Sequence, residues 1–183
     1  KASQGIVSFA GLTIAGTPLV DYSFSFTSTI DAASIVSADS DSIQVIHGAV
    51  HHLEILNQAA GAAAGLAFTD QPKIQIDDLD GFVVNSGVGS NAVVTATVSE
   101  GGILVGTVTA TADKGVATFT DLGLGGKVGD YVITYSLAAP EVSVEQDIAL
   151  TFGVATKVAI VRQPVGAITG DNFDVQPIVE VED

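Results

Sequence analysis

The chain contains no cysteine, no tryptophan and no methionine among its 183 residues. The lack of cysteine excludes a disulfide framework, a thiolate zinc site and a thiol nucleophile. Because methionine is absent, Lys1 is not a translation start, and we expect a processed or excised piece of a polypeptide. Tyrosine occurs only three times. Sugar-cleaving sites usually use aromatic platforms, so this scarcity argues against a glycosidase.

Positive charge is also scarce. Six Lys and Arg residues stand against 21 Asp and Glu, for a formal net charge of −15. Nucleic acids and anionic membranes both require clustered cations on the protein, so neither is an expected partner. No run of 18 apolar residues occurs, and the closest stretch, Ala59–Phe68, is short and rich in Ala and Gly. We therefore expect no membrane insertion of this segment.

The residues that are abundant favour strands. Only 15% of the residues are charged, whereas β-branched residues form short alternating runs separated by Gly, Asp and Asn, which is typical of an all-β chain. Strands that alternate in this way bury one face each, and two such sheets packed together form a β-sandwich. The middle of the chain predicts seven strands: Leu53–Asn57, Lys73–Asp77, Val93–Ser99, Leu104–Thr111, Val116–Phe119, Tyr131–Tyr135 and a last one marked by Ile148, Leu150 and Phe152. The alternation turns Ile74 and Ile76 inward, puts Tyr131, Ile133 and Tyr135 on one face, and assigns Phe119 and Phe152 to the core.

An internal repeat organises the sequence. Residues 52–78 align with residues 157–183 at a shift of 105, with nine identities in 27 positions. The identical pairs are Ile55/Ile160, Gln58/Gln163, Gly61/Gly166, Ala62/Ala167, Gly65/Gly170, Phe68/Phe173, Gln71/Gln176, Pro72/Pro177 and Asp78/Asp183. The beginning of the chain matches as well: Gly5–Leu12 aligns with Gly115–Leu122, Asp21-Tyr22 with Asp130-Tyr131, and Ile43–Gly48 with Ile148–Gly153.

These matches predict tandem repeats of about 105 residues, the size of one immunoglobulin-like sandwich. Residues 1–49 would be the C-terminal half of one repeat, residues 50–154 a complete repeat, and residues 155–183 the N-terminal part of a third. The shift that aligns the first copy with the second falls from 110 to 105 residues along the first copy. The first copy therefore has about five extra residues, which we place in the acidic Ser/Ala stretch Thr29–Ser42.

The chain resembles the bacterial immunoglobulin-like repeats of large surface proteins, the invasin/intimin type. Three stretches carry this resemblance: Ile160–Gly170 followed by Gln176–Asp183, Gly115–Leu122, and Gly129–Thr134. It implies a non-enzymatic, secreted or cell-surface module that forms a stalk, fibre or lattice, with neighbouring repeats or identical subunits as partners. An adhesin or carbohydrate-binding module is the alternative, because repeats of this type serve as spacers, adhesive tips and lattice subunits alike. An accessory domain of a large secreted enzyme is a third possibility.

One acidic turn is a candidate calcium site. Asp77, Asp78 and Asp80 follow a predicted strand, with Gly81 allowing a tight bend. Calcium takes several hard oxygen ligands, although the spacing is not that of an EF-hand loop. Extracellular sandwich arrays often hold calcium where modules meet, and Glu182-Asp183 begins the same turn in the next copy. We expect no other cofactor.

Other motifs favour structural explanations. His47, His51 and His52 lie at a predicted repeat junction and could be considered as zinc or copper ligands. Against a metal site, His51 and His52 point to opposite faces of a strand, and the other junction has Phe152, Thr156 and Lys157 at these positions. The glycines of residues 87–92 precede a predicted strand, whereas a dinucleotide loop precedes a helix. No Gly-x-Ser-x-Gly elbow occurs. We therefore expect no enzymatic activity.

The incomplete repeats leave two explanations open. Half of a sandwich exposes unpaired strand edges, which invite pairing. Either the polypeptide continues in both directions as a longer tandem array, or the ends of neighbouring subunits complete each other by strand complementation. The counterparts of about Leu79–Ala110 are missing from both ends, so the expectation is a window on a longer array.

Overall fold

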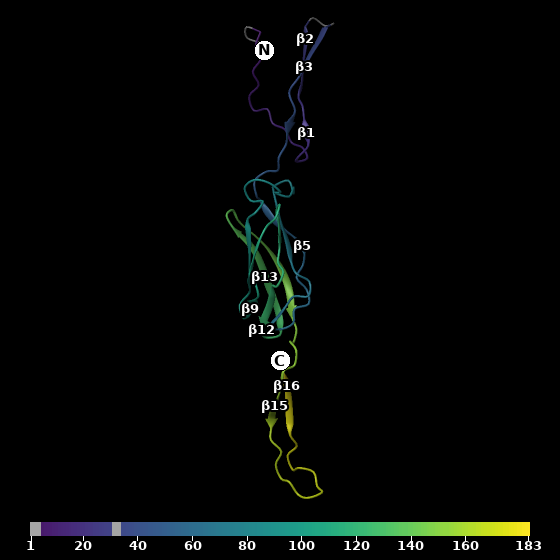
Figure 1. The fold of residues 1–183 in the computed structure, drawn as a ribbon, viewed down its shortest axis with the longest axis vertical. Helices are drawn as coiled ribbons and strands as arrows, with labels where there is room; N and C mark the ends of the chain where they lie inside the picture. The colour runs from purple at the N-terminus through teal and green to yellow at the C-terminus, as the bar shows by residue number, and fades with distance from the viewer. Residues whose placement is uncertain (1–4, 31–33) are drawn as a thin grey trace.

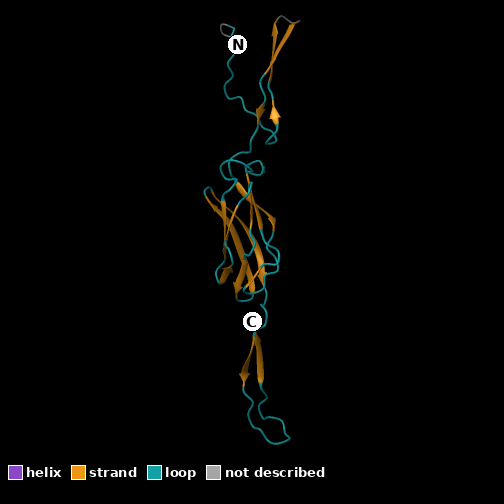
Figure 2. Cartoon of the chain, in the orientation of Figure 1, coloured by secondary structure: helices purple, strands orange, loops and turns teal. Residues whose placement is uncertain are grey.

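The computed structural model describes residues 5–30 and 34–183, and every regular element within them is a β-strand. Three parts follow one another along the long axis in Figure 1: the N-terminal segment (residues 5–49), the central sandwich (residues 50–154) and the C-terminal hairpin (residues 155–183). Figure 2 shows only strands joined by loops. Among the described residues, no helix is long and apolar enough to cross a membrane.

The central sandwich contains ten of the strands. They are β5 (His52–Asn57), β6 (Leu66–Ala67), β7 (Lys73–Asp77), β8 (Val93–Val98), β9 (Gly102–Val105), β10 (Thr109–Thr111), β11 (Val116–Thr118), β12 (Gly123–Gly126), β13 (Gly129–Ala138) and β14 (Glu141–Leu150). One sheet has the order β11-β7-β5, a second has β10-β8-β13-β14, and a small third has β6-β12-β9. The all-β class predicted from the composition is confirmed.

The core lies between these sheets, and period-two alternation supplies it. Ile74 and Ile76 of β7 are fully buried, as predicted, and Tyr131, Ile133 and Tyr135 of β13 point to the same interior. Such alternation places successive side chains on opposite faces of a strand. The Gln146 side chain joins β14 to the loop after β5. It accepts a hydrogen bond from the Ala59 N–H (2.9 Å) and donates one to the Ala59 carbonyl (2.6 Å).

Two strand predictions need correction. The predicted strand Leu104–Thr111 is two strands in different sheets, because Gly106 turns the chain at a φ of 79°. A Cβ at Gly106 would also collide with the carbonyl oxygen of Asp121. The predicted last strand ends at Leu150, and Phe152, which we expected in the core, is exposed.

The flanking segments consist of paired strands. In the N-terminal segment, β1 (Asp21–Tyr22) pairs with β4 (Ile43–Gln44), and β2 (Ser25–Ile30) pairs with β3 (Ser34–Asp39). The C-terminal hairpin pairs β15 (Lys157–Arg162) with β16 (Ile178–Glu182).

The pairing in the C-terminal hairpin reproduces that of β5 with β7, shifted by 105 residues. Leu53 lies opposite Ile76, and Val158 lies opposite Val181; the same shift relates every other pair in the two ladders. The ladder irregularity also recurs, between Ile55 and Asn57 in one and between Ile160 and Arg162 in the other. We call residues related in this way, or by the alignment of Gly5–Leu12 with Gly115–Leu122, counterparts.

Candidate functional site

The candidate site is the pair of junctions at which the central sandwich meets its two flanking segments. At the first junction, the Gly48 N–H donates a hydrogen bond of 2.6 Å to Oδ2 of Asp78. At the second, the Gly153 N–H donates a hydrogen bond of 2.6 Å to Oδ2 of Asp183. Each bond spans 30 residues of sequence. We call this glycine-to-aspartate hydrogen bond the clasp.

Asp78 is positioned by the turn that follows β7. Its Oδ1 accepts hydrogen bonds from the backbone N–H groups of Asp80 (3.1 Å) and Phe82 (2.9 Å), while Oδ2 accepts the clasp bond from Gly48. Burial raises the pKa of Asp78, but the three N–H donors and the nearby His47 together lower it by more, so the pKa lies below its ordinary value. The carboxylate therefore stays ionised while it joins two parts of the chain.

Glycine suits the donor position because the carboxylate approaches closely. A Cβ at Gly48 would lie 3.3 Å from both Cβ and Oδ2 of Asp78. At Gly153 it would lie 3.1 Å from Oδ2 of Asp183 and 2.8 Å from the carbonyl oxygen of Ala64. A side chain at Gly48 would require the Asp78 side chain to shift by a few tenths of an ångström, and one at Gly153 would require the Ala64 carbonyl or the Gly153 backbone to move.

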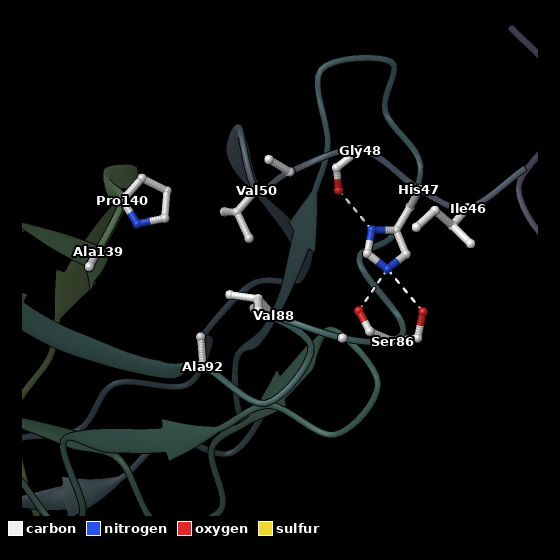
Figure 3. A pocket seen from close by; sticks show the side chains of 12 residues that line it. Ile46, His47, Gly48, Val50, Ser86, Val88, Ala92, Ala139 and Pro140 are labelled. Atoms are coloured by element: carbon white, nitrogen blue, oxygen red, sulfur yellow. Dashed lines mark hydrogen bonds between the residues drawn. The ribbon is translucent and has the colours of Figure 1, made fainter. Parts of the chain in front are cut away.

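His47 adds a second contact at the first junction. Figure 3 shows its ring between the chain at Gly48 and the loop that carries Ser86. Nδ1 lies 2.7 Å from the Gly48 carbonyl oxygen, and Nε2 lies 2.7 Å from the Ser86 carbonyl oxygen and 3.1 Å from Ser86 Oγ. The ring thereby connects the end of the N-terminal segment to the central sandwich.

An apolar pocket of about 620 Å³ lies beside His47, as Figure 3 shows. Its walls include Ile46, Val50, Val88 and Pro140. They come from three parts of the chain: the junction itself, the glycine-rich loop before β8, and the turn between β13 and β14. The glycines of that loop form a turn and precede a strand, as predicted, instead of a phosphate-binding helix.

The second junction keeps the clasp and changes its surroundings. Phe152, the counterpart of His47, is exposed beside Gly153. The pocket there has about 820 Å³ and is lined by Lys127, Phe152, Glu180 and Glu182 among others. The clasp is thus the feature that the two junctions share, whereas the histidine contact belongs to the first alone.

Asp77 is a buried carboxylate of a different kind. Its side chain is 1% exposed, and Oδ1 accepts a hydrogen bond of 2.9 Å from Gln75 Nε2. Oδ2 has no hydrogen-bond partner among the described residues and lies 3.7 Å from His52 Nε2. Burial raises the pKa of Asp77 above its ordinary value, and Gln75 and His52 offset only part of that effect.

The candidate calcium residues therefore have separate environments. Asp77 points toward Gln75 and His52, Asp78 gives both oxygens to backbone N–H groups, and Asp80 is exposed on the turn. Within residues 5–30 and 34–183, no three His, Asp or Glu side chains form a group that could hold a metal ion. Calcium binding by these three residues stays a prediction.

The three histidines also have different neighbours. His51 and His52 lie edge to face with ring centroids 5.9 Å apart, His52 approaches Asp77, and His47 bonds to backbone carbonyls and to Ser86. Sequence reasoning placed one junction at His47–His52 and the other at Phe152–Lys157 but missed the clasp. The available signal was the identity of both Asp78/Asp183 and Gly48/Gly153 at one spacing of 105.

No family model matches the sequence, and no curated protein matches it. The fold is similar to part of a glycosyl hydrolase family 2 member from Bacteroides cellulosilyticus, with a TM-score of 0.43 and 11% identity over 74% of this chain and 18% of that chain. It is also similar to part of Parabacteroides merdae beta-glucuronidase, with a TM-score of 0.42 and 13% identity over 64% of this chain and 14% of that chain. This chain spans less than a fifth of the length of either protein.

Proposed function

We propose that this chain is a non-enzymatic structural module of a bacterial secreted or cell-surface protein, built from tandem immunoglobulin-like sandwiches of about 105 residues. In this proposal, the central sandwich is one complete repeat and the flanking segments belong to its neighbours. The repeats form a stalk, fibre or surface lattice, and the clasp sets the orientation of one repeat relative to the next.

The recurrence of the clasp carries this proposal. Two hydrogen bonds of equal length, each from a glycine N–H to an aspartate Oδ2, lie 105 residues apart and at the two ends of one sandwich. A contact that serves one loop has no reason to recur at the repeat spacing, whereas a contact that joins modules must recur at every junction. The extended arrangement of the three parts in Figure 1 is also what a stalk requires.

The central sandwich is suited to bearing load. Its sheets share one core, and β13 and β14 pair along ten residues each. In addition, Gln146 of β14 makes a bidentate contact with the backbone of Ala59, in the loop after β5. Such a unit gives way cooperatively, and we expect it to unfold as one piece under tension.

Single-molecule stretching of the whole chain between terminal handles tests the mechanical role. We expect one main unfolding event, in which residues 50–154 lengthen the chain by at most roughly 380 Å at ~3.6 Å per residue. Several small events without a main one would contradict a single load-bearing sandwich.

Antibody labelling of intact source cells tests the location, and labelling only after lysis would contradict a surface role. Saturable binding in a glycan screen would favour the adhesin alternative.

A further inference from the structure

His47 lies at the first junction with a carbonyl oxygen against each of its ring nitrogens, as Figure 3 shows. Nδ1 lies 2.7 Å from the Gly48 carbonyl oxygen, and Nε2 lies 2.7 Å from the Ser86 carbonyl oxygen. A carbonyl oxygen has lone pairs but no proton, so it can only accept a hydrogen bond. Both ring nitrogens must therefore carry a proton if both of these contacts are to be hydrogen bonds.

A neutral imidazole cannot make both bonds, because it has one N–H group and one bare nitrogen. When the proton is on Nε2, the lone pair of Nδ1 points at the Gly48 carbonyl oxygen. When the proton is on Nδ1, the lone pair of Nε2 points at the Ser86 carbonyl oxygen. The Ser86 hydroxyl, 3.1 Å from Nε2, is then the one hydrogen-bond donor beside it among the described residues. The imidazolium is the form that donates to both carbonyls.

The charges around this ring also favour the imidazolium. The ionised carboxylate of Asp78 interacts electrostatically with His47, and a nearby negative charge favours the charged form of an imidazole. The glycine-rich loop that carries Ser86, residues 85–92, has no titratable side chain. The other titratable residues on the elements around the junction and this loop are Asp41, His51, His52, Asp77, Asp80, Asp113, Lys114 and Glu141. Acidic residues predominate in this set.

The second junction has no comparable group. Phe152 stands there in place of His47, and its hydrocarbon ring takes up no proton. The clasp, in contrast, is present at both junctions. Protonation of a histidine ring therefore acts on the first junction and not on the second.

We propose that His47 is a pH-sensitive link between the N-terminal segment and the central sandwich, closed when its ring is protonated and weakened when the ring is neutral. Because the closed contact holds an additional proton, acidification stabilises the junction and a rise in pH loosens it. Histidine is the side chain that ordinarily changes charge between pH 5 and 8. The link joins two described segments directly, so it goes beyond the proposed function and does not depend on further repeats.

A distance measurement across the first junction tests this link. The chain has no native cysteine, so spin labels can be attached at Ser37→Cys on β3 and Ser143→Cys on β14, both at exposed positions. Double electron–electron resonance in buffer with chelator then gives the distribution of distances between the labels. We expect the ratio of closed to open junction to be roughly tenfold higher at about pH 5 than at about pH 8. Equal distributions at the two pH values would overturn the proposal.

Substitutions separate His47 from the other titrating groups. His47→Phe introduces the residue of the second junction and should abolish the pH response. His51→Phe is the matched control, because it makes the same change at a histidine whose ring does not bond to the Ser86 loop, and it should retain the response. Ser86→Ala keeps the carbonyl but removes the hydroxyl that can donate to the neutral ring. It should leave the pH 5 distribution unchanged and broaden that at pH 8. A response that survives in His47→Phe, or is lost in His51→Phe, would overturn the proposal.

The second junction is the internal control. Labels at Ser143→Cys on β14 and Val161→Cys on β15 span it, and their distance distribution should be the same at both pH values. An equal pH response there would mean that a group other than His47 drives the motion, and would overturn the proposal. A first junction that ignores pH would leave the single unfolding event of the central sandwich under tension unchanged, so this proposal and the proposed function fail separately.

Discussion

The hairpin β5–β7 and the C-terminal hairpin β15–β16 have the same ladder in different surroundings. Both have antiparallel pairing in one register and the same irregularity. In the first, Ile74 and Ile76 are buried under a second sheet, whereas in the second their counterparts face solvent. The comparison separates two levels of structure: the local sequence determines which residues pair, and burial depends on a partner sheet.

The two junctions make a second comparison. Both have the clasp, but His47 at the first junction is replaced by Phe152 at the second. A hydrogen bond between a carboxylate and a backbone N–H is charge-assisted and hence strong, and the carboxylate is buried at the first junction (Asp78) and exposed at the second (Asp183). The histidine contact is added where the neighbouring loop offers the Ser86 carbonyl. The common element, and not the variable one, is therefore the candidate for setting the geometry between the central sandwich and its flanking segments.

The largest expected effect is on the free energy of unfolding, when a buried aromatic ring is removed and the result is compared with removal of its exposed counterpart. Phe119→Ala removes a buried ring from the core and should lower the free energy of unfolding of the central sandwich by about 3–5 kcal/mol. Phe9→Ala removes its exposed counterpart and should cost less than ~0.5 kcal/mol in dilute solution. Urea unfolding followed by circular dichroism measures both. Equal losses would mean that the N-terminal segment already has a folded core of its own.

A smaller effect should follow from breaking the clasp. Asp78→Ala leaves three N–H groups without their acceptor and should lower the stability by about 1–3 kcal/mol. Asp78→Asn retains an acceptor for Asp80 and Phe82 but turns an amide N–H₂ toward the Gly48 N–H, so it should loosen the junction with less loss of stability. Small-angle scattering of both variants should show a wider range of junction angles, and the exposed neighbour Asp80→Asn should not.

The pH dependence of the clasp follows from the depressed pKa of Asp78. Because that pKa is lower in the folded state, the stabilisation is complete above the unfolded value of 3.8 and is lost as the pH falls through the folded value. The stability difference between the native chain and Asp78→Ala should therefore be constant near neutral pH and shrink below about pH 4. A difference that grows on acidification would contradict this role.

Sequence reasoning predicted those elements whose alternation is regular. Lys73–Asp77 has the predicted bounds, and Tyr131, Ile133 and Tyr135 share the interior face as expected. It missed β12, Gly123–Gly126, since glycine gives no alternation to read. It joined β9 to β10 across Gly106, because the collision that forces the turn involves Asp121, a residue remote in sequence.

The candidate site was only partly predictable, because its contacts also join residues that are remote in sequence. The acidic turn was identified, but three adjacent carboxylates look alike in sequence, and only the fold assigns them different environments. Asp78 meets Gly48 across 30 residues, a contact that no local pattern announces. The sequence alignment pairs apolar residues of the flanking segments with core residues, and the ladder of the C-terminal hairpin reproduces that of β5 and β7, but alignment alone does not say which of these residues face solvent.

Asp77 should give a third, smaller effect, opposite in sign to that of Asp78. Its pKa is raised in the folded state, so folding favours the protonated form, and the cost of burying the charge grows as the pH rises from 3.8 through the folded value. Asp77→Asn removes this cost and should raise the stability at neutral pH by roughly 1 kcal/mol. The gain should vanish in acid. Thermal melts at pH 3 and pH 7 measure it, and a loss of stability at pH 7 would mean that the ion pair with His52 outweighs burial.

Calcium should have the smallest effect if the clasp is intact. Asp78 accepts three backbone hydrogen bonds, so a calcium ion on Asp77, Asp78 and Asp80 would have to replace some of these donors. If the acidic turn binds calcium as predicted, millimolar calcium should raise the melting temperature by less than Asp78→Asn lowers it, and chelator should reverse the rise. A saturable stabilisation by calcium that disappears in Asp80→Asn would confirm the site, and no saturable effect would contradict it. Because magnesium prefers a smaller octahedral site, it is the control that separates such binding from general screening of the acidic surface.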